Sequence, residues 1–347
     1  MFVAWRDLRF AKGRFALMGA VIVLITLLVG LLSGLTAGLA RQNISAITDL
    51  NADRIVFSDP GGDDLSFSTS ALTREQWQRW SDAPGVTGAE PLGISTARAT
   101  AGASRAAVSV FAVGSGSTLV PGGEPISAGT AVLSETAAED LDAGPGDPVS
   151  VNGEDLTVTA VRGDDSFGHT PVVWTTLTEP AATVIALTTA DGFDGAATDR
   201  LVGTKTVSKG DSLSAIGSYT SENGSLQLMR GFLFVISALV IGAFFTVWTV
   251  QRSGDIAVLK ALGAPTSFLL RDALGQAVAL LTVCTLVGTG LAATLGALIS
   301  GSVPFDLSFS TVLIPAVVMI ALGAVGAALA VRRVTSVDPL IALGSAR

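Results

Sequence analysis

"FALMGAVIVLITLLVGLLSGLTAGLA", residues 15–40, contains no charged residue and is long enough to cross a membrane as one helix. The hydrocarbon core of a bilayer needs about 20 apolar residues in a helix. Three later stretches, 231–251, 273–305 and 307–331, also lack Asp, Glu, Lys and Arg. A cleaved signal peptide is the alternative for the first stretch, but its apolar region is normally about 7–15 residues long. The sequence therefore predicts four transmembrane helices, at residues 15–40, 231–251, 273–300 and 310–331.

The chain between the first two predicted helices, residues 41–230, has a different composition. It carries 11 Lys and Arg against 24 Asp and Glu, a net charge of −13. Runs rich in β-branched residues, such as 170–177, are typical of strands. Residues 73–76 form a capping-box pattern at the start of a helix, and Asn152-Gly153 is a hairpin signal. We expect an inserted α+β domain with stalk-like ends, and its acidity argues against binding to nucleic acid.

The basic residues predict which side of the membrane each segment faces. They collect before the first predicted helix, between the second and third, and after the fourth: Arg6, Arg9, Lys12, Arg14, Arg252, Lys260, Arg271, Arg332, Arg333 and Arg347. Cytoplasmic segments of membrane proteins are enriched in Lys and Arg. Both termini, with the tail 332–347, and the loop 252–272 should therefore be cytoplasmic. The inserted domain and the short loop 301–309, which has no basic residue, should be extracellular, on a multi-pass protein of the plasma membrane.

Gly30, Gly34 and Gly38 recur every four residues in the first predicted helix. This spacing places them on one face, where the missing side chains let another backbone approach closely. We interpret the row as a seam with a second copy of the chain or as a groove for a substrate; packing against another helix of the same chain is the alternative. No predicted span holds an ionisable residue at mid-depth, which argues against a proton pump or an ion channel.

The stretch "QRSGDIAVLKALGAP", residues 251–265, is too short and too charged to span the membrane. Its apolar residues Ile256, Leu259 and Leu262 recur at three-residue steps, while Asp255 and Lys260 fall on other faces of a helix. An amphipathic helix of this kind on the cytoplasmic side can dock into a partner's groove or lie on lipid headgroups. A plain connecting loop is the alternative.

The sequence lacks the residue sets that are typical of an active site. His169 is the only histidine and Cys284 the only cysteine, so a cluster of histidines around a metal and a disulfide within the chain are both excluded. The phosphate-binding loop of ATPases is also missing, because "GTKT" at 203–206 lacks its upstream glycine and its Gly-Lys order. We expect no enzymatic activity, no permanently bound cofactor or metal, and no ATP binding by this chain itself.

The stretch "RSGDIAVLKALGAP" resembles the signature of the FtsX-like (MacB-type) permease family of ABC transporters, although Asp255 stands where glutamate is commoner. The resemblance extends over the whole chain. Residues 1–14 resemble the family's cytoplasmic amphipathic N-terminal helix, 129–161 its periplasmic-type core domain, and 332–347 its C-terminal end. Four spans with one large insertion after the first is also the family's topology.

This resemblance implies a mechanism in which ATP is hydrolysed on another subunit. Two permease chains, a homodimer in the lipid bilayer, would pair with two copies of a separate ABC ATPase. Closing of the ATPases would then move the first and second helices and the outer domain. The segment that would dock on the ATPase is marked by Arg252, Asp255, Ile256, Leu259, Lys260, Leu262 and Gly263.

Within the family, the compact outer domain and the short loops are most similar to the haem-efflux permeases of Gram-positive bacteria. A haem is flat, has apolar faces and carries anionic propionates, so a glycine-faced pair of first helices would leave room for it in the outer leaflet. Basic residues can pair with propionates, and axial ligands are drawn from His, Met, Cys or Tyr. The candidates for haem binding are Arg41, Arg230, Met229, Tyr219, His169 and, as a weaker ligand, Glu222.

Two other functions stay open at this point. The chain could be a non-transporting mechanotransmitter, whose outer domain activates a cell-wall hydrolase or a sensor kinase. It could also export lipoproteins or peptides, although such exporters usually have a larger outer domain or an additional partner. The candidate ligands likewise have structural alternatives, as an interfacial anchor for Tyr219, a membrane-edge filler for Met229 and a loop residue for His169.

Overall fold

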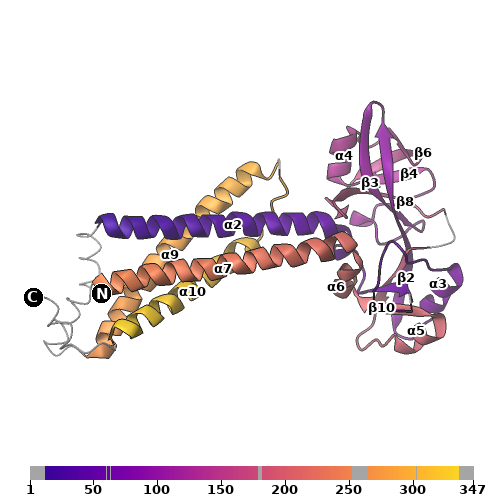
Figure 1. Cartoon of the computed structure of the whole chain (residues 1–347). Coiled ribbons are helices and arrows are strands. Elements are labelled where there is room, and N and C mark those ends of the chain that lie inside the picture. Colours follow the sequence, from indigo (N-terminus) through magenta and orange to yellow (C-terminus); the bar gives the residue numbers. More distant parts are fainter. Residues whose placement is uncertain are drawn as a thin grey trace, which may run out of the picture. The chain divides into compact units, whose positions relative to one another are not determined.

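The structure, a computed structural model, describes residues 12–59, 61–62, 64–178, 182–251, 265–301 and 303–335. The chain divides into two compact units. We call Met1–Gly38 with Ser225–Arg347 the membrane unit, and Leu39–Gly224 the domain unit. Figure 1 shows long helices in the former and a sheet with short helices in the latter. Each unit is described by itself.

Four helices that are long and apolar enough to cross a membrane confirm the predicted spans. They are α2 (Lys12–Thr48), α7 (Gly217–Gln251), α9 (Thr266–Ile299) and α10 (Phe309–Thr335). Two of them extend far beyond the apolar stretches that predicted them. Helix α2 runs past residue 40 to Thr48, and α7 begins at Gly217, well before residue 231. The predicted boundaries at 40 and 231 therefore mark changes of composition within continuous helices.

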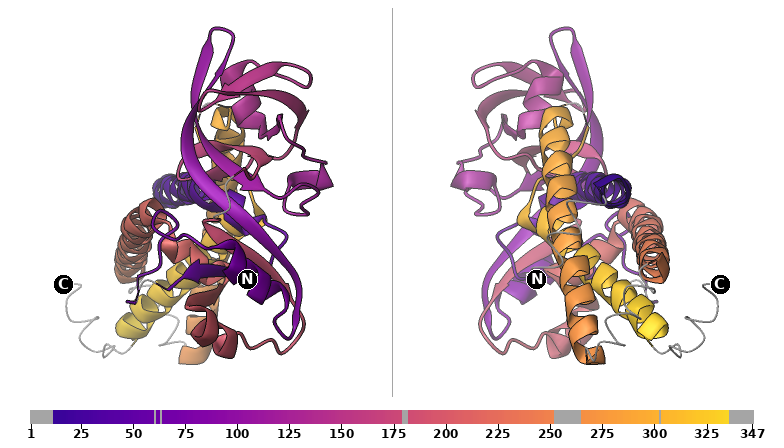
Figure 2. Two further views of the ribbon diagram at one scale, coloured as in Figure 1. Left: turned by 90° about the vertical axis from the view of Figure 1, so that its right-hand side faces the viewer. Right: turned by 90° about the vertical axis from the view of Figure 1, so that its left-hand side faces the viewer.

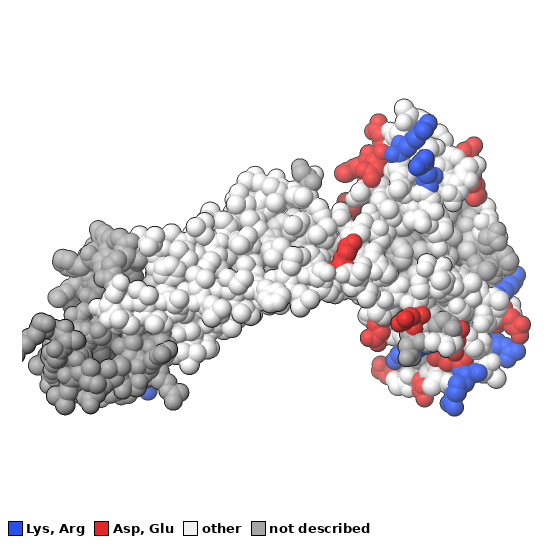
Figure 3. Space-filling model, in the orientation of Figure 1, with Lys and Arg blue, Asp and Glu red and all other residues white. Residues whose placement is uncertain are grey.

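The core of the membrane unit receives side chains from all four helices. Ile22 of α2, Phe245 of α7, Leu281 of α9 and Met319 of α10 are each at most 1% exposed and belong to one cluster. Large apolar side chains such as Leu239, 69% exposed, cover the outside. Outward-facing leucines suit a bilayer, because lipid tails are as apolar as leucine. Figure 3 shows charged side chains gathered on the domain unit, and almost none on the described surface of the membrane unit.

The domain unit is built on one mixed sheet, which confirms the predicted α+β class. Its strands run in the order β10-β1-β9-β2-β3-β8-β4-β6-β5, with β7 paired to β8. The pairs β3–β8 and β4–β6 are parallel, and the other pairs are antiparallel. The strands are β1 (Arg54–Ser58), β2 (Val86–Ala101), β3 (Ser104–Val113), β4 (Thr130–Leu133), β5 (Pro148–Val151), β6 (Glu154–Val161), β7 (Ser166–Phe167), β8 (Thr170–Thr176), β9 (Val184–Thr189) and β10 (Thr204–Ser208).

Short helices cover this sheet, and the β2–β3 hairpin is its longest feature (Figure 2). The helices are α3 (Arg74–Ser81), α4 (Glu135–Leu141), α5 (Ala196–Val202) and α6 (Lys209–Ser212), with 3-10 turns at Pro121–Gly123 and Leu213–Ala215. The local signals of the sequence are confirmed where they are strongest. Thr73 caps α3 together with Gln76. The turn between β5 and β6 holds Asn152 and Gly153, both with positive φ.

The domain unit holds three apolar clusters. One packs around Trp80 of α3, and the other two receive side chains from the parallel β3–β8 pair. The larger of these two holds Phe57, Phe111 and Trp174, and it also takes in Ile47 and Leu50 near the end of α2. The smaller of these two lies beneath α4 and includes Leu133 and Leu141. Because Ile47 and Leu50 are at most 3% exposed, the final turns of α2 are part of the core of this domain.

Candidate functional site

The short turn between β7 and β8 is hydrogen-bonded to helix α2. The backbone N–H groups of Gly168 and His169 donate to the carbonyl oxygens of Asn43 and Gln42, at 3.0 and 3.1 Å. Ser45 completes the contact, because its hydroxyl accepts from the Ser166 N–H at 2.8 Å and lies 3.3 Å from the Ser166 carbonyl oxygen. The turn is therefore held to α2 by main-chain bonds.

His169 occupies an uncommon backbone position in this turn. Its φ of +65° lies in the left-handed region that side-chain-bearing residues rarely adopt. The preceding Gly168 also has a positive φ, of +59°. Histidine is among the residues enriched several-fold at such positions, together with Asn and Asp. The two residues turn the chain so that the His169 ring is brought beside the first turns of α7.

The His169 ring joins α2 and α7 through one nitrogen. Its Nε2 lies 2.8 Å from a carboxylate oxygen of Glu222 and 3.1 Å from the amide nitrogen placed on Asn43. An ionised carboxylate only accepts, so the short contact to Glu222 requires a proton on Nε2. On the other side of the Asn43 amide, the Ser218 hydroxyl donates to the Asn43 Oδ1 at 2.8 Å. We refer to His169, Glu222, Asn43 and Ser218 as the His169 network.

Asp165 lies just before this turn and is nearly buried, with 5% of its surface exposed. Burial is the largest of the effects that raise the pKa of its carboxyl from 3.8 to about 6. The neighbouring charges of Asp49 and Asp164 raise the pKa further, and that of Arg41 lowers it. The Trp174 indole N–H is buried without a partner of good hydrogen-bond geometry, although it lies close enough to the carboxyl to lower its pKa.

Asp165→Asn should make the protein more stable at neutral pH and change the pH dependence of its stability. The folded protein binds a proton at Asp165 more tightly than the unfolded chain does, because the pKa is raised from 3.8 to about 6. Below pH 4 the aspartate is protonated in both states and does not destabilise the folded protein. As the pH rises from 4 to about 6, the protein with aspartate becomes less stable than the protein with asparagine. With allowance for solvent screening, we expect the variant to gain about 1–2 kcal/mol at pH 7.5.

Thermal melting of the full-length protein at pH 4.5 and pH 7.5 checks this expectation. The variant should melt higher than the unaltered protein at the upper pH, and the difference should be much smaller at the lower pH. Asp164→Asn is the matched control, because Asp164 is exposed and accepts a hydrogen bond from Thr136. An equal effect of both substitutions at pH 7.5 would contradict a role for burial at Asp165.

The structure brings two of the predicted haem-binding residues into contact, and the others have different surroundings. His169 and Glu222 form the contact described above, with side chains 30% and 47% exposed. Arg41 lies 3.6 Å from Asp49 in an exposed ion pair, and the half-buried Tyr219 packs against the core of the domain unit. Met229 and Arg230 belong to the membrane unit, where Met229 is 50% exposed and the Arg230 guanidinium lies 5.9 Å from the ring centre of Phe234.

Three polar residues of this region could not be selected from the sequence as functional candidates. Asn43 and Ser45 are 1% exposed, yet they sit in an ordinary polar segment after an apolar helix. Asp165 stands in an Asp-Asp pair of the kind that usually marks a solvated turn. Only their contacts with the β7–β8 turn and α7 distinguish them. Within the described residues, no group of three His, Cys, Asp or Glu side chains is placed to hold a metal ion.

The predicted glycine row is covered by residues of the same chain, all of them in the membrane unit. A Cβ added at Gly30 would lie 2.7 Å from the Cβ of Ala292 in α9. Added at Gly34 it would overlap the ring of Phe305, and at Gly38 the carbonyl of Pro304. In this structure the row serves packing within the chain, which is the alternative to a seam with a second copy or an open substrate groove. A seam or a groove at this row would require the 303–308 segment to move.

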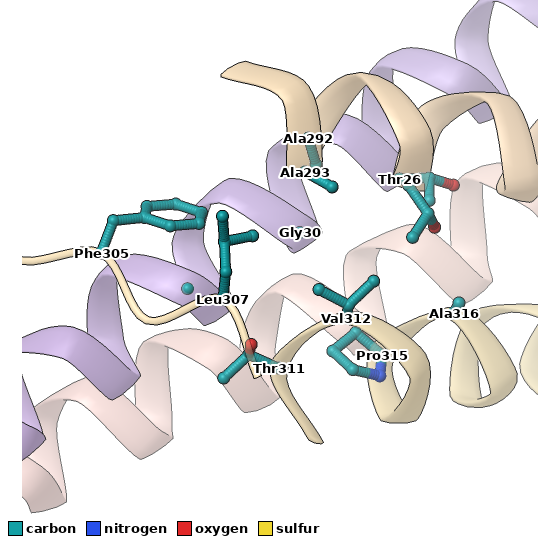
Figure 4. A pocket seen from close by; sticks show the side chains of 12 residues that line it. Thr26, Gly30, Ala292, Ala293, Phe305, Leu307, Thr311, Val312, Pro315 and Ala316 are labelled. Atoms are coloured by element: carbon teal, nitrogen blue, oxygen red, sulfur yellow. The ribbon is translucent and has the colours of Figure 1, made fainter. Parts of the chain in front are cut away.

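A small cavity lies beside this row, between α2, α9 and α10 (Figure 4). Its free volume is about 10 Å³, room for about one water molecule. The residues that line it are Thr26, Gly30, Gly34, Thr289, Ala292, Ala293, Phe305, Leu307, Thr311, Val312, Pro315 and Ala316. The cavity is thus mostly apolar, with three threonines as its polar groups.

The predicted ATPase-docking segment cannot be compared with the structure. Its marked residues, Arg252, Asp255, Ile256, Leu259, Lys260, Leu262 and Gly263, lie outside the described residues, as do residues 1–11 and 336–347. The helices on either side of the segment are described. Helix α7 ends at Gln251 and α9 begins at Thr266 after Pro265.

Two family models match the chain. The model of the MacB-like periplasmic core domain matches residues 15–205, and that of the FtsX-like permease C-terminal region matches residues 228–339.

A protein of Staphylococcus haemolyticus, provisionally named hemin transport system permease protein HrtB, is 27% identical over 99% of both chains. An HrtB of Staphylococcus epidermidis is 28% identical over the same shares. An uncharacterised ABC transporter permease of Mycobacterium bovis is 26% identical over 76% of both chains. The crystal structure of the periplasmic region of MacB from Actinobacillus actinomycetemcomitans matches with a TM-score of 0.38 and 12% identity, over 48% of this chain and 94% of that one.

Proposed function

Because the chain belongs to the FtsX-like permeases of ABC transporters that carry a MacB-like periplasmic core domain, we propose that it exports a flat, amphipathic cargo, most simply haem. The broad function, an ABC transporter permease, follows from the family. The cargo is the finer proposal. It is supported by relatives over the whole length of the chain that are named for hemin transport.

The observation that carries the cargo proposal is the exposed contact between His169 and Glu222. A histidine nitrogen is a common axial ligand of haem iron, and the Nε2 that contacts Glu222 is the atom that would bind it. The two side chains are exposed enough to reach a ligand, and they stand in the domain unit without a catalytic partner. Haem is the cargo in this proposal and not a resident cofactor. Exchange of the Glu222 contact for the iron would free the carboxylate to act as a weaker second ligand.

We further propose that two copies of the chain work with two copies of a separate ATPase in the plasma membrane. Both termini and residues 252–272 would lie in the cytoplasm, as the distribution of Lys and Arg favours. ATP hydrolysis on another subunit is supported by the family and by the sequence, which has no phosphate-binding loop. The His169 network would then transmit movement, since it ties α2 and α7 to the β7–β8 turn of the sheet.

His169→Ala should weaken haemin binding by about tenfold or more and alter the Soret spectrum of the bound haemin. An axial ligand determines the electronic state of the iron, whereas Tyr219 packs against the domain core. Tyr219→Phe should therefore bind haemin with an unchanged spectrum, and it serves as the control. The measurement is a spectral titration of the purified full-length protein with haemin. Unchanged spectra in His169→Ala, Met229→Ala and the double variant would remove both residues as ligands.

The export function itself is tested by ATP hydrolysis. The permease is reconstituted in lipid with its cognate ATPase, and haemin is added. Stimulation of the ATPase and removal of haemin from the outer leaflet support the proposal. Hydrolysis that does not respond to haemin, together with a requirement for a cell-wall hydrolase or a sensor kinase, would instead support mechanotransmission. Stimulation by a lipoprotein or a peptide alone would identify the other class of cargo.

A further inference from the structure

The ring of Phe305 lies between two glycines of the membrane unit, Gly34 and Gly296, and we call the space that it fills the seat of the ring. Phe305 belongs to the segment 303–308, which connects α9 to α10. A Cβ added at Gly34 of α2 or at Gly296 of α9 would overlap atoms at the tip of this ring. No side chain other than that of glycine fits at either position while the ring is in place. The ring is thus wedged directly against two helix backbones.

The segment that carries Phe305 is held on α2 by few polar contacts. The Asp306 N–H donates to the Gly34 carbonyl oxygen at 3.1 Å, and the Thr311 hydroxyl donates to the Asp306 carbonyl oxygen at 2.9 Å. The carbonyl of Pro304 lies against Gly38. If the Asp306 N–H moves away, the Gly34 carbonyl oxygen can keep its hydrogen bond within the helix. The segment could therefore lift away from α2 without unravelling the helix.

The cavity described above continues the seat of the ring inward along α2. Phe305 and Gly34 line the cavity, and Figure 4 shows Phe305 on one side of Gly30 and Thr26 on the other. Thr26 is 3% exposed, and its hydroxyl has no hydrogen-bond partner. Thr246 and Thr282 donate to the carbonyl four residues before them. Ser33, Thr36 and Thr285 are also buried without a partner, but of these hydroxyls only that of Thr26 belongs to a residue that lines the cavity. A buried hydroxyl without a partner costs free energy, so Thr26 marks a place where a polar group of a ligand would be stabilised.

We propose that the seat of Phe305 and the adjoining cavity form a binding slot for the edge of a flat apolar ring system, which Phe305 closes in this structure. Phe305 stands in for the ligand, since its own flat ring already occupies the slot. Because Gly34 and Gly296 have no side chains, the gap between α2 and α9 is thick enough for one aromatic ring. The unpartnered Thr26 hydroxyl would bind a polar substituent of the ligand. The slot rests on the proposed export of a flat, amphipathic cargo, and it gives that cargo a place in the membrane unit.

The small free volume means that the slot cannot hold the Phe305 ring and a ligand at the same time. About 10 Å³ remains beside the ring, which holds one water molecule at most. A ligand can therefore enter only when the ring leaves, and ligand and ring compete for one place. Competition of this kind predicts that removal of the ring strengthens binding, which is the opposite of what loss of an ordinary contact residue would do.

The test uses protoporphyrin IX, a flat tetrapyrrole without iron, so that binding does not depend on an axial ligand. It is titrated into the purified full-length protein in lipid nanodiscs, and its fluorescence is followed. Phe305→Ala should bind it at least fivefold more tightly than the unaltered protein. In the Phe305→Ala background, Gly296→Leu should fill the slot and reverse the gain. Gly290→Leu in the same background is the matched control, because a Cβ at Gly290 of α9 meets no atom within 4 Å, and it should keep the tighter binding.

A second measurement keeps Phe305 in place and does not depend on the stability of Phe305→Ala. Asp306→Cys in a Cys284→Ala background is labelled with a membrane-impermeant maleimide. Saturating protoporphyrin IX should speed the labelling severalfold, because residue 306 leaves its contact with Gly34 when the segment moves. A labelling rate that does not change at saturation would overturn the proposal.

The outcomes separate the slot from the export function. Equal binding by Gly296→Leu and Gly290→Leu in the Phe305→Ala background overturns the slot and leaves export of the cargo standing. Haemin-stimulated ATP hydrolysis that persists in such variants would place the cargo elsewhere in the protein. No binding of protoporphyrin IX by any variant, together with hydrolysis that does not respond to haemin, overturns both proposals.

Discussion

Gly288→Leu is expected to abolish correct packing of the membrane unit, whereas Gly290→Leu, two residues further along α9, should be tolerated. A Cβ at Gly288 would lie 2.7 Å from the Val23 carbonyl oxygen and 2.8 Å from the Thr26 Cβ, both in α2. A Cβ at Gly290 would meet no atom within 4 Å. The side chain added at Gly288 meets a helix backbone, which cannot rotate out of the way. The two helices must therefore move apart.

The expected cost of Gly288→Leu is large against the total stability of a protein. Overpacking a core with extra methylene groups typically costs about 1–3 kcal/mol, and contact with a backbone puts this site at or above the upper end. Native proteins are stable by only about 5–15 kcal/mol. Gly290→Leu instead adds one more outward-facing leucine to α9, like Leu286 at 59% exposed.

The measurement compares the yield, size-exclusion profile and melting temperature of the two variants after extraction from membranes. Gly288→Leu should give little monodisperse protein, or melt at least 10 °C lower, and Gly290→Leu should match the unaltered protein. Equal behaviour of the two variants would show that α2 and α9 do not pack as they do here. It would also remove the geometric basis for the slot at Phe305.

The glycine row shows how far spacing alone predicts helix packing. Four-residue spacing placed Gly30, Gly34 and Gly38 on one face, and the structure confirms a close contact there. Spacing cannot name the partner, because a helix of the same chain and one of a second chain require the same small residues. Gly30 faces Ala292 of α9, but Gly34 and Gly38 face Phe305 and Pro304, which lie in a short connection without any periodic pattern. The same limit applies to His169 and Glu222, which are far apart in sequence and meet only because the sheet brings the β7–β8 turn to α7.

Helix ends were the other feature that composition could not predict. Lack of charge identifies the part of a helix that suits a membrane, and it predicted the four helices that are long and apolar enough to cross one. It gives no information about where the backbone stops being helical. The polar run at the start of α7, from Gly217 onwards, has few apolar residues, yet it is helical because Ser218 and Glu222 bond to Asn43 and His169 and Tyr219 packs against the domain core. Tertiary contacts therefore override a weak local preference for helix.

Leu259→Asp is expected to abolish export while leaving the protein inserted and folded. We predict that the segment from Arg252 to Gly263 forms an amphipathic helix that docks on the ATPase, with Leu259 on its apolar face. A buried leucine at such an interface contributes roughly 2–4 kcal/mol, and an aspartate would in addition lose its hydration there. This corresponds to about a 30- to 1,000-fold weaker contact with the ATPase. Stimulation of ATP hydrolysis and export of the cargo should both fall by more than 90%.

Ala257→Asp is the matched control for this variant. It introduces the same charge into the same segment, but Ala257 lies two residues before Leu259 and therefore on the opposite side of the predicted helix, so it should retain most of the stimulation. Melting temperature and haemin binding by the isolated permease should be unchanged in both variants, because neither depends on the ATPase. Export and hydrolysis at normal rates in Leu259→Asp would mean that the ATPase binds the permease at a site that does not include Leu259. A fall in haemin binding without ATPase present would instead show that the substitution damages the permease itself, and the coupling role of Leu259 would have to be abandoned.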